Sequence, residues 1–141
     1  MTVDFFAVEA GDVLPDFAVR ADADAVRAYL DATGEAASVA DGLWEEIVPP
    51  LALGAFVFSG LLETMPLARG TLHTGQEFDF RRPVLIGEEL TARITVARRS
   101  ERRELMMTVL MLELRDGDDI VVTGRTTLVN PVSDRADGIA T

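Results

Sequence analysis

Very few side chains in this sequence can carry acid–base or nucleophilic chemistry near neutral pH. His73 is the single histidine and there is no cysteine. Thiolate nucleophiles, disulfides, Cys-ligated metals and multi-His metal sites within one chain are therefore excluded, and we expect no metal. Any imidazole acid–base chemistry must use His73. A structural or interface role for the same ring is the alternative, and we favour it.

Guanidinium groups, which bind phosphate and acidic surfaces through paired hydrogen bonds, gather in two places. Arg81 and Arg82 stand just before Pro83. The second group lies in the next expected hairpin and consists of Arg98, Arg99, Arg102 and Arg103. For Arg81 and Arg82, anion binding and a plain surface role are equally open. For the hairpin group we favour local ion pairs with acids such as Glu101 and Glu104.

The composition is that of an ordinary globular domain. The 141 residues are 48% hydrophobic and 26% charged, which fits one domain with a hydrophobic core. The formal net charge of -11 repels a phosphate backbone, so we expect no nucleic-acid partner. The first basic residue is Arg20, unlike a secretory leader, and the apolar run over residues 47–62 is shorter than the roughly 20 residues that cross a bilayer. We expect a cytoplasmic protein without a membrane span.

Helical signals dominate the first half of the chain. After an irregular lead-in with a short strand at residues 17–21, Asp22 or Asp24 can cap a helix that Gly34 ends, which predicts a helix over 22–33. Residues 35–46 fit either a loop or a short helical turn. The pair Pro49 and Pro50 favours a helix start. Because residues 51–62 are apolar nearly all round, we predict a buried central helix rather than a half-exposed one.

The second half alternates with a period of two, which predicts antiparallel strands. Gln76, Phe78 and Phe80 form one face of a strand over 76–81, and a second strand over 90–96 follows a turn at Gly87. Residues 105–114 are apolar on both faces, so we expect a central strand covered above and below. A turn at 116–119 leads to a strand over 120–129. One sheet curled around one helix leaves an open edge, so pairing with a second chain is expected.

Two segments resemble the MaoC-like hydratases and dehydratases. Residues 73–90, HTGQEFDFRRPVLIGEEL, match an H-x-x-Q-x-F-x-F strand followed by a P-V-x-x-G-D-x-L turn. Residues 24–35 are similar to the first helix of that family, which ends in T-G-D. The resemblance implies an α+β hotdog fold, in which a long antiparallel sheet wraps around one buried central helix. We expect a single hotdog domain over 1–132, with the small and polar residues 133–141 as a disordered tail.

The family resemblance further implies work on acyl thioesters of coenzyme A or an acyl carrier protein, with water added or removed between the second and third carbons and no cofactor. Catalytic members carry a D-x-N-P-x-H motif after the first helix. In this sequence Glu35 takes the carboxylate position, while Ala40 or Val39 takes the histidine position. The candidate catalytic residues are therefore Glu35 and His73, in place of the usual dyad.

Dehydration needs a base, an acid and donors for an enolate-like oxygen. Backbone amides at the start of the central helix, around residues 51–54, can supply those donors. At Gly54, close approach of substrate and tight packing of a strand are equally open. The substrate-binding candidates are Leu51, Gly54, Phe56, Phe78, Phe80, Arg81 and Arg82.

Three functions fit these residues. The first is a hydratase or dehydratase with an atypical or incomplete dyad. The second is a non-catalytic hotdog subunit that shapes the acyl pocket of a catalytic partner. The third is an acyl-thioester binding module, or a thioesterase that uses Glu63 on the central helix. The expected partners are an acyl thioester and a second hotdog chain, in a homodimer or a heterodimer.

Overall fold

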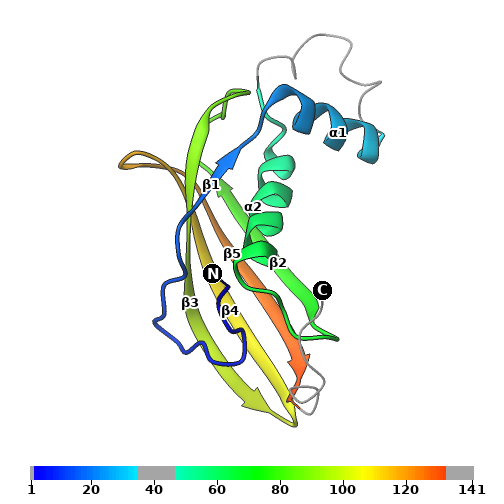
Figure 1. Ribbon diagram of the computed structural model, residues 1–141, viewed down its shortest axis with the longest axis vertical. Helices are drawn as coiled ribbons and strands as arrows, with labels where there is room; N and C mark the ends of the chain where they lie inside the picture. Colours follow the sequence, from blue (N-terminus) through cyan, green and yellow to red (C-terminus); the bar gives the residue numbers. More distant parts are fainter. Residues whose placement is uncertain (1, 35–46, 133–141) are drawn as a thin grey trace.

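The computed structural model describes residues 2–34 and 47–132 (Figure 1). The elements in chain order are β1 (Phe17–Arg20), α1 (Ala23–Thr33), α2 (Pro50–Thr64), β2 (Leu72–Phe80), β3 (Glu89–Arg102), β4 (Leu105–Asp116) and β5 (Asp119–Pro131). Residues 35–46 and 133–141 lie outside the described residues, and so do the predictions made for them. Within the described ranges, no helix combines the length and apolarity that crossing a bilayer requires.

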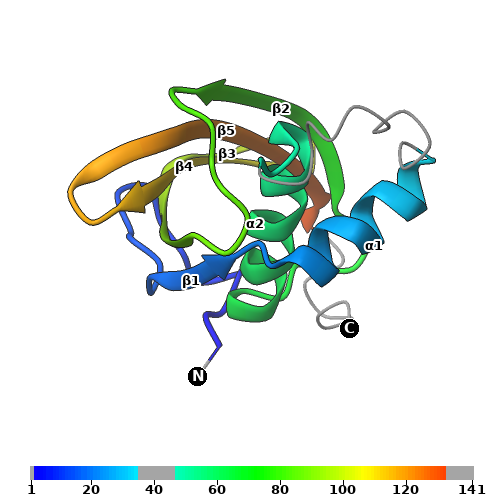
Figure 2. The same cartoon turned by 90° about the horizontal axis from the view of Figure 1, so that it is seen from above.

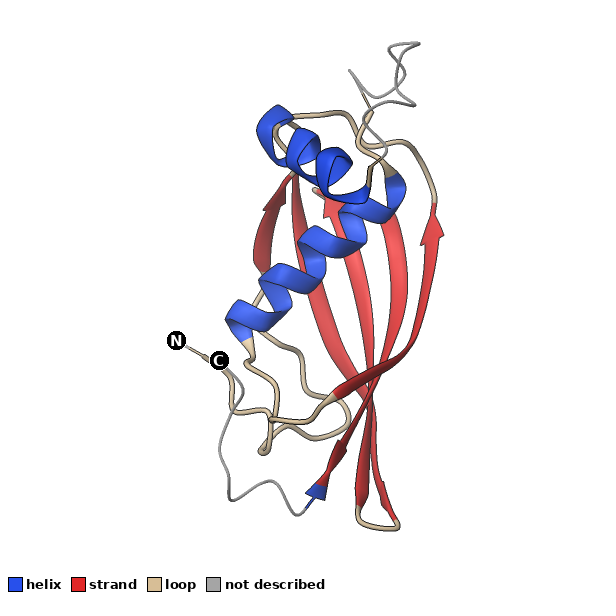
Figure 3. Ribbon diagram, turned by 90° about the vertical axis from the view of Figure 1, so that its right-hand side faces the viewer, coloured by secondary structure: helices blue, strands red, loops and turns tan. Residues whose placement is uncertain are grey.

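The predicted first helix is confirmed as α1. The Asp22 side chain accepts a hydrogen bond from the Ala25 N–H at 2.8 Å, which satisfies a donor that the helix itself leaves unpaired. Gly34 ends the helix in the left-handed region, with φ 75. Val26 and Leu30 are its buried residues. Figure 3 shows α1 at the end of the sheet where α2 begins, with both helices on the same side of the sheet.

The sheet has five antiparallel strands in the order β1-β3-β4-β5-β2. Seen from above, it curls around α2 (Figure 2). The predicted alternation is confirmed in β3, where Leu90, Ala92, Ile94 and Val96 are buried. A register shift between Val96 and Arg98 then changes which residues face the helix. Arg103 and Glu104 form the two-residue turn to β4 with positive φ, 54 and 64.

Helix α2 starts at Pro50, as predicted, and faces the sheet with Ala52, Leu53, Gly54, Val57 and Leu61. The expected burial all round is wrong, however, because Leu51 is 65% exposed and Leu62 is exposed as well. The helix lies on one face of the sheet only, so its far side has no cover in the described part of the chain.

Strand β4 is central in the sheet, but its predicted cover on both faces is wrong. Leu110, Leu112 and Leu114 are buried on the helix side. On the opposite face Leu105 is 46% exposed and Met111 is 43% exposed. Both helices lie on the concave side, and no described segment covers the other side (Figure 3).

Two glycines let α2 lie close to the sheet. An added Cβ at Gly54 would lie 2.5 Å from the tip of the Phe78 ring on β2. The ring of Phe17 on β1 occupies the place of a side chain at Gly60 in the same way. Of the two roles considered for Gly54, the structure therefore shows tight packing: the absence of a side chain lets Phe78 of β2 reach the helix backbone.

The segment before β1 is anchored by an arginine of the hairpin group. Phe5 is fully buried, and the Arg99 guanidinium lies 4.9 Å from the centre of its ring. Arg99 also donates a hydrogen bond to the Phe5 carbonyl at 2.6 Å. Arg99 of the hairpin group thus binds a residue far away in the chain.

The Gly54 contact predicts a coupling between two sites. Gly54→Ala should lower the free energy of unfolding by about 1–3 kcal/mol, because the added methyl group collides with Phe78. In a Phe78→Leu background the same change should stabilise the protein by about 1 kcal/mol, since alanine favours helix over glycine. Denaturant unfolding of the four proteins measures both values. Gly75→Ala is a control, because its Cβ would meet Thr127 only at 3.5 Å; equal effects of Gly54→Ala in the two backgrounds would contradict the contact.

The two adjacent arginines of β3 should differ in their effect on stability. Arg99→Ala should lower the free energy of unfolding by about 2 kcal/mol, because it removes a charged hydrogen bond and a cation–π contact. Arg98→Ala should change it by less than about 0.5 kcal/mol, because Arg98 is exposed. Thermal or denaturant unfolding checks both variants. Equal effects would show that Phe5 is not held by Arg99.

Candidate functional site

Two open grooves meet at the first turn of α2. We name the first the helix groove; it has a volume of about 280 Å³ and is lined by Leu51, Gly54, Ala55, Phe58, His73, Gln76 and Phe78. We name the second the arginine groove; it has a volume of about 400 Å³ and is lined by Ile47, Val48, Pro50, Leu53, Phe80, Arg81, Arg82, Pro83 and Val84. The rings of Phe78 and Phe80, one in each groove, lie 5.5 Å apart.

His73 is held in the helix groove by two neighbours. Its ring stacks on Phe58, with centroids 4.9 Å apart and planes 2° from parallel. Its Nε2 atom lies 3.0 Å from the Gln76 side-chain oxygen, which also accepts a hydrogen bond from the Thr126 hydroxyl at 2.7 Å. Because that oxygen is an acceptor, Nε2 carries a proton and donates it. Proton transfer to His73 would therefore have to use Nδ1.

A strand irregularity brings these groups together. Residues three apart on a regular strand point to opposite faces. The register of β2 shifts between His73 and Gly75, so His73 and Gln76 meet on the same face. Gln76 was missing from the predicted site residues, although its spacing from His73 in the H-x-x-Q pattern was a signal for it.

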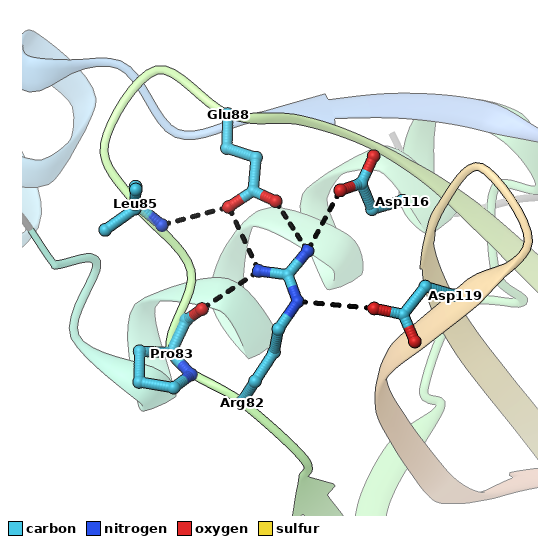
Figure 4. Close-up of polar contacts among 6 residues, drawn as sticks. All are labelled: Arg82, Pro83, Leu85, Glu88, Asp116 and Asp119. Carbon is cyan, nitrogen blue, oxygen red and sulfur yellow. Dashed lines mark hydrogen bonds and ion pairs between the residues drawn. The ribbon is translucent and has the colours of Figure 1, made fainter.

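Arg82 is the centre of an ion-pair network rather than a free cation (Figure 4). Its Nη2 atom lies 2.6 Å from Glu88 and 3.1 Å from Asp116, and its Nε atom lies 3.5 Å from Asp119. Glu88 also accepts a hydrogen bond from the Leu85 N–H at 3.1 Å. The network ties the loop after β2 to the turn between β4 and β5, and so fixes one wall of the arginine groove.

The network changes the acid–base properties of its members. The hydrogen bond from Arg82, its positive charge and the bond from the Leu85 amide hold the pKa of Glu88 below its usual range, against the opposing effect of burial. The same carboxylate raises the pKa of Arg82. Both groups are charged at neutral pH, and neither has a free hydrogen-bonding edge for a ligand phosphate.

Arg81 is the available cation of the pair. Its side chain is 50% exposed, and its one ion pair with a described residue is a long contact of 3.8 Å with Asp79. Its backbone N–H is bonded to the Val121 carbonyl at 2.9 Å, so the residue is fixed while its guanidinium is accessible. The structure thus separates two arginines that the sequence left equivalent.

The first turn of α2 forms the wall between the grooves. Pro49 precedes the helix and no side chain caps it. Leu51 and Gly54 face the helix groove, whereas Pro50 and Leu53 face the arginine groove. The Leu51 amide lies before the first helical hydrogen bond and at the positive end of the helix dipole, where it can donate to a ligand oxygen.

The remaining predicted residues are distributed unevenly. Glu35 lies outside the described residues. Phe56 is partly buried against the core and lines neither groove. Glu63 is exposed near the end of α2 and lines neither groove. The structure thus brings together Leu51, Gly54, Phe78 and His73 in one groove and Phe80, Arg81 and Arg82 in the other.

Comparison with known proteins finds one similar curated protein and no matching family model. No family model matches the chain. The (R)-specific enoyl-CoA hydratase of Aeromonas caviae is 31% identical over 77 residues, which are 55% of this chain and 57% of that protein. The matched part is thus little more than half the length of this curated relative.

Solved structures agree with the fold over most of the chain. The (R)-hydratase of A. caviae involved in PHA biosynthesis superimposes with a TM-score of 0.63 at 25% identity, covering 86% of this chain and 96% of that one. The HadBC (3R-hydroxyacyl-ACP dehydratase) complex of Mycobacterium tuberculosis has a TM-score of 0.63 at 20% identity, covering 88% and 98%. At that lower identity the likeness shows the hotdog fold. Together, the sheet wrapped around α2 and these relatives show that the chain has the hotdog fold and resembles MaoC-like hydratases and dehydratases.

Proposed function

We propose that the chain binds an acyl thioester and serves in the reversible hydration of an enoyl thioester to a 3-hydroxyacyl thioester. The observation that carries this proposal is the junction of two largely apolar grooves at the uncapped start of α2, with Arg81 beside it. The similarity to an (R)-specific enoyl-CoA hydratase supports it. The thioester belongs to coenzyme A or to an acyl carrier protein.

Each part of such a substrate has a matching partner in the grooves. A phosphate of the carrier group would bind Arg81, and the acyl chain would lie against Phe78 or Phe80. The thioester oxygen would accept a hydrogen bond from the Leu51 amide, which stabilises charge that develops on it. In the hydration direction a base takes a proton from water, the water oxygen bonds to the third carbon, and the second carbon receives a proton.

The groups for proton transfer are Glu35 and His73. Glu35 takes the place of the carboxylate in the family motif, and an apolar setting would raise its pKa toward neutral. His73 would act through Nδ1, because Gln76 already uses the proton on Nε2. No cofactor is needed for this chemistry.

A second candidate function is a supporting subunit whose partner carries the complete dyad. Two features of the surface favour it. Within the described part of the chain, strand β2 pairs only with β5, which leaves its other edge open there, and Leu51 and Leu62 are exposed along the neighbouring side of α2. A second hotdog chain that pairs with β2 would cover this side of α2 as well. The similar structure of HadBC, a 3R-hydroxyacyl-ACP dehydratase, was solved as a complex.

Hydration of crotonyl-CoA by the purified chain tests the proposal, followed through the loss of the enoyl absorbance. We expect turnover by the chain, and a loss of about 10²–10⁴-fold in Glu35→Gln, because a positioned acid–base group contributes that much. His73→Gln tests the imidazole in the same assay. Turnover that appears only when a hotdog chain with an intact dyad is added would establish the supporting subunit instead. No turnover under either condition would overturn both.

Substitution of Arg81 should affect ligand affinity, whereas substitution of Arg82 should affect stability. Arg81→Ala should weaken the affinity for coenzyme A about two- to fivefold at low ionic strength and less at high salt, because an exposed ion pair is screened. Arg82→Ala should instead lower the free energy of unfolding by about 1–3 kcal/mol, since it leaves Glu88 partly buried without its partner. Calorimetric titration and denaturant unfolding measure the two effects. The opposite assignment would show that Arg82 is the anion-binding residue.

A further inference from the structure

The convex face of the sheet, turned away from α2, carries a patch of apolar side chains. We name it the outer patch; it consists of the exposed Leu72, Leu105 and Met111, the partly exposed Met107 and Val129, and Val109 between them, which is itself buried. The strand register places these residues side by side: Val129 lies opposite Met107 on one side and Leu72 on the other. Leu72 is 65% exposed, more than either Leu105 or Met111. The patch thus continues across three neighbouring strands.

Arginines border the outer patch on the same face. Residues opposite each other on antiparallel strands point to the same side of a sheet. Arg98 lies opposite Val109, Arg102 opposite Leu105, and Arg125 opposite Met111. The patch is therefore an apolar strip with guanidinium groups along both edges of β4.

These three arginines have no ion pair within residues 2–34 and 47–132, in contrast to other arginines of the sheet. Arg93 binds Asp16 at 3.0 Å and Arg115 binds Glu113 at 2.7 Å. The carboxylate nearest in register is Glu77, opposite Arg125. A chain with a net charge of -11 thus presents unpaired positive charge around its exposed apolar strip.

We propose that the outer patch is the docking surface for an acidic amphipathic helix of another protein. A strand that is apolar on both faces requires a layer on each, and β4 has a layer on one. From Leu105 to Met111 the strip is about 20 Å long, which matches a helix of about 13 residues. Acidic residues beside the apolar stripe of that helix would pair with the arginines, and the flexible methionines would adapt to its side chains.

A second copy of this chain fits the same face poorly. Two outer patches placed face to face would bring arginines of one copy against arginines of the other, and like charges across an interface oppose association. Charge complementarity therefore selects an acidic partner over self-association. The proposal is independent of hydratase activity, because the outer patch lies on the face of the sheet opposite α2 and both grooves.

The test uses a synthetic amphipathic peptide of about 15 residues, with an apolar stripe at helical spacing flanked by glutamates. Control peptides have lysine in place of glutamate, or the same composition without the stripe. Fluorescence anisotropy measures affinity, and carbon-13 methyl spectra of the methionines locate the contact. We expect Met107 and Met111 to shift, whereas the fully buried Met65 should not.

Charge-reversal variants sharpen the test. R98E/R125E should weaken binding of the glutamate peptide at least about tenfold, and salt should weaken binding to the wild-type protein. R27E is the control, since Arg27 is exposed and belongs to α1, which lies on the concave side of the sheet (Figure 3); it should leave affinity unchanged. Equal melting temperatures confirm that the variants fold.

Three results would overturn the proposal. The first is equal affinity for the glutamate, lysine and scrambled peptides. The second is binding without a shift of Met107 and Met111. The third is an assembly larger than a dimer in sedimentation that Met111→Glu returns to a dimer, which would identify a second copy as the occupant. Crotonyl-CoA hydration by the same preparations reports on the proposed function separately, and its loss leaves these outcomes unaffected.

Discussion

The contact between the Phe78 ring and the backbone at Gly54 sets the distance from α2 to β2, and the other features of the site depend on that distance. With a side chain at Gly54, the helix would stand further from the strand or the ring would leave the core. Phe78 lies in the helix groove and contacts Phe80 in the arginine groove. One missing Cβ thus determines how both grooves meet at the start of the helix.

Local signals in the sequence were enough to predict most of the fold. The cap at Asp22, the left-handed Gly34 and the alternation of Leu90, Ala92, Ile94 and Val96 depend on neighbours within a few residues, and each is confirmed. The cover of α2 and β4 could not be predicted in this way. Apolar residues all round an element predict that something covers them, but not that the cover belongs to the same chain.

The candidate site was less predictable, because contacts with residues far away in the sequence determine which of its side chains are free to bind a ligand. Arg81 and Arg82 are neighbours in the sequence, yet only Arg82 meets Asp116 and Asp119. Those acids are brought to it by the turn between β4 and β5. His73 meets Gln76 only because of a register shift in β2. The resemblance to a family identified the segment, whereas contacts across the sheet decide which of its residues are free to bind a ligand.

The hairpin between β3 and β4 determines which of its arginines point inward and which point to the surface. Its turn consists of two residues with left-handed backbone, Arg103 and Glu104, and such a short turn fixes the strand register. In this register Arg99 points inward to Phe5 while Arg98 points outward. The shift between Val96 and Arg98 decides which of them does so, because a regular strand would continue the inward series of Leu90, Ala92, Ile94 and Val96 with Arg98. The turn and this bulge together therefore place one arginine in the interior and its neighbour on the surface.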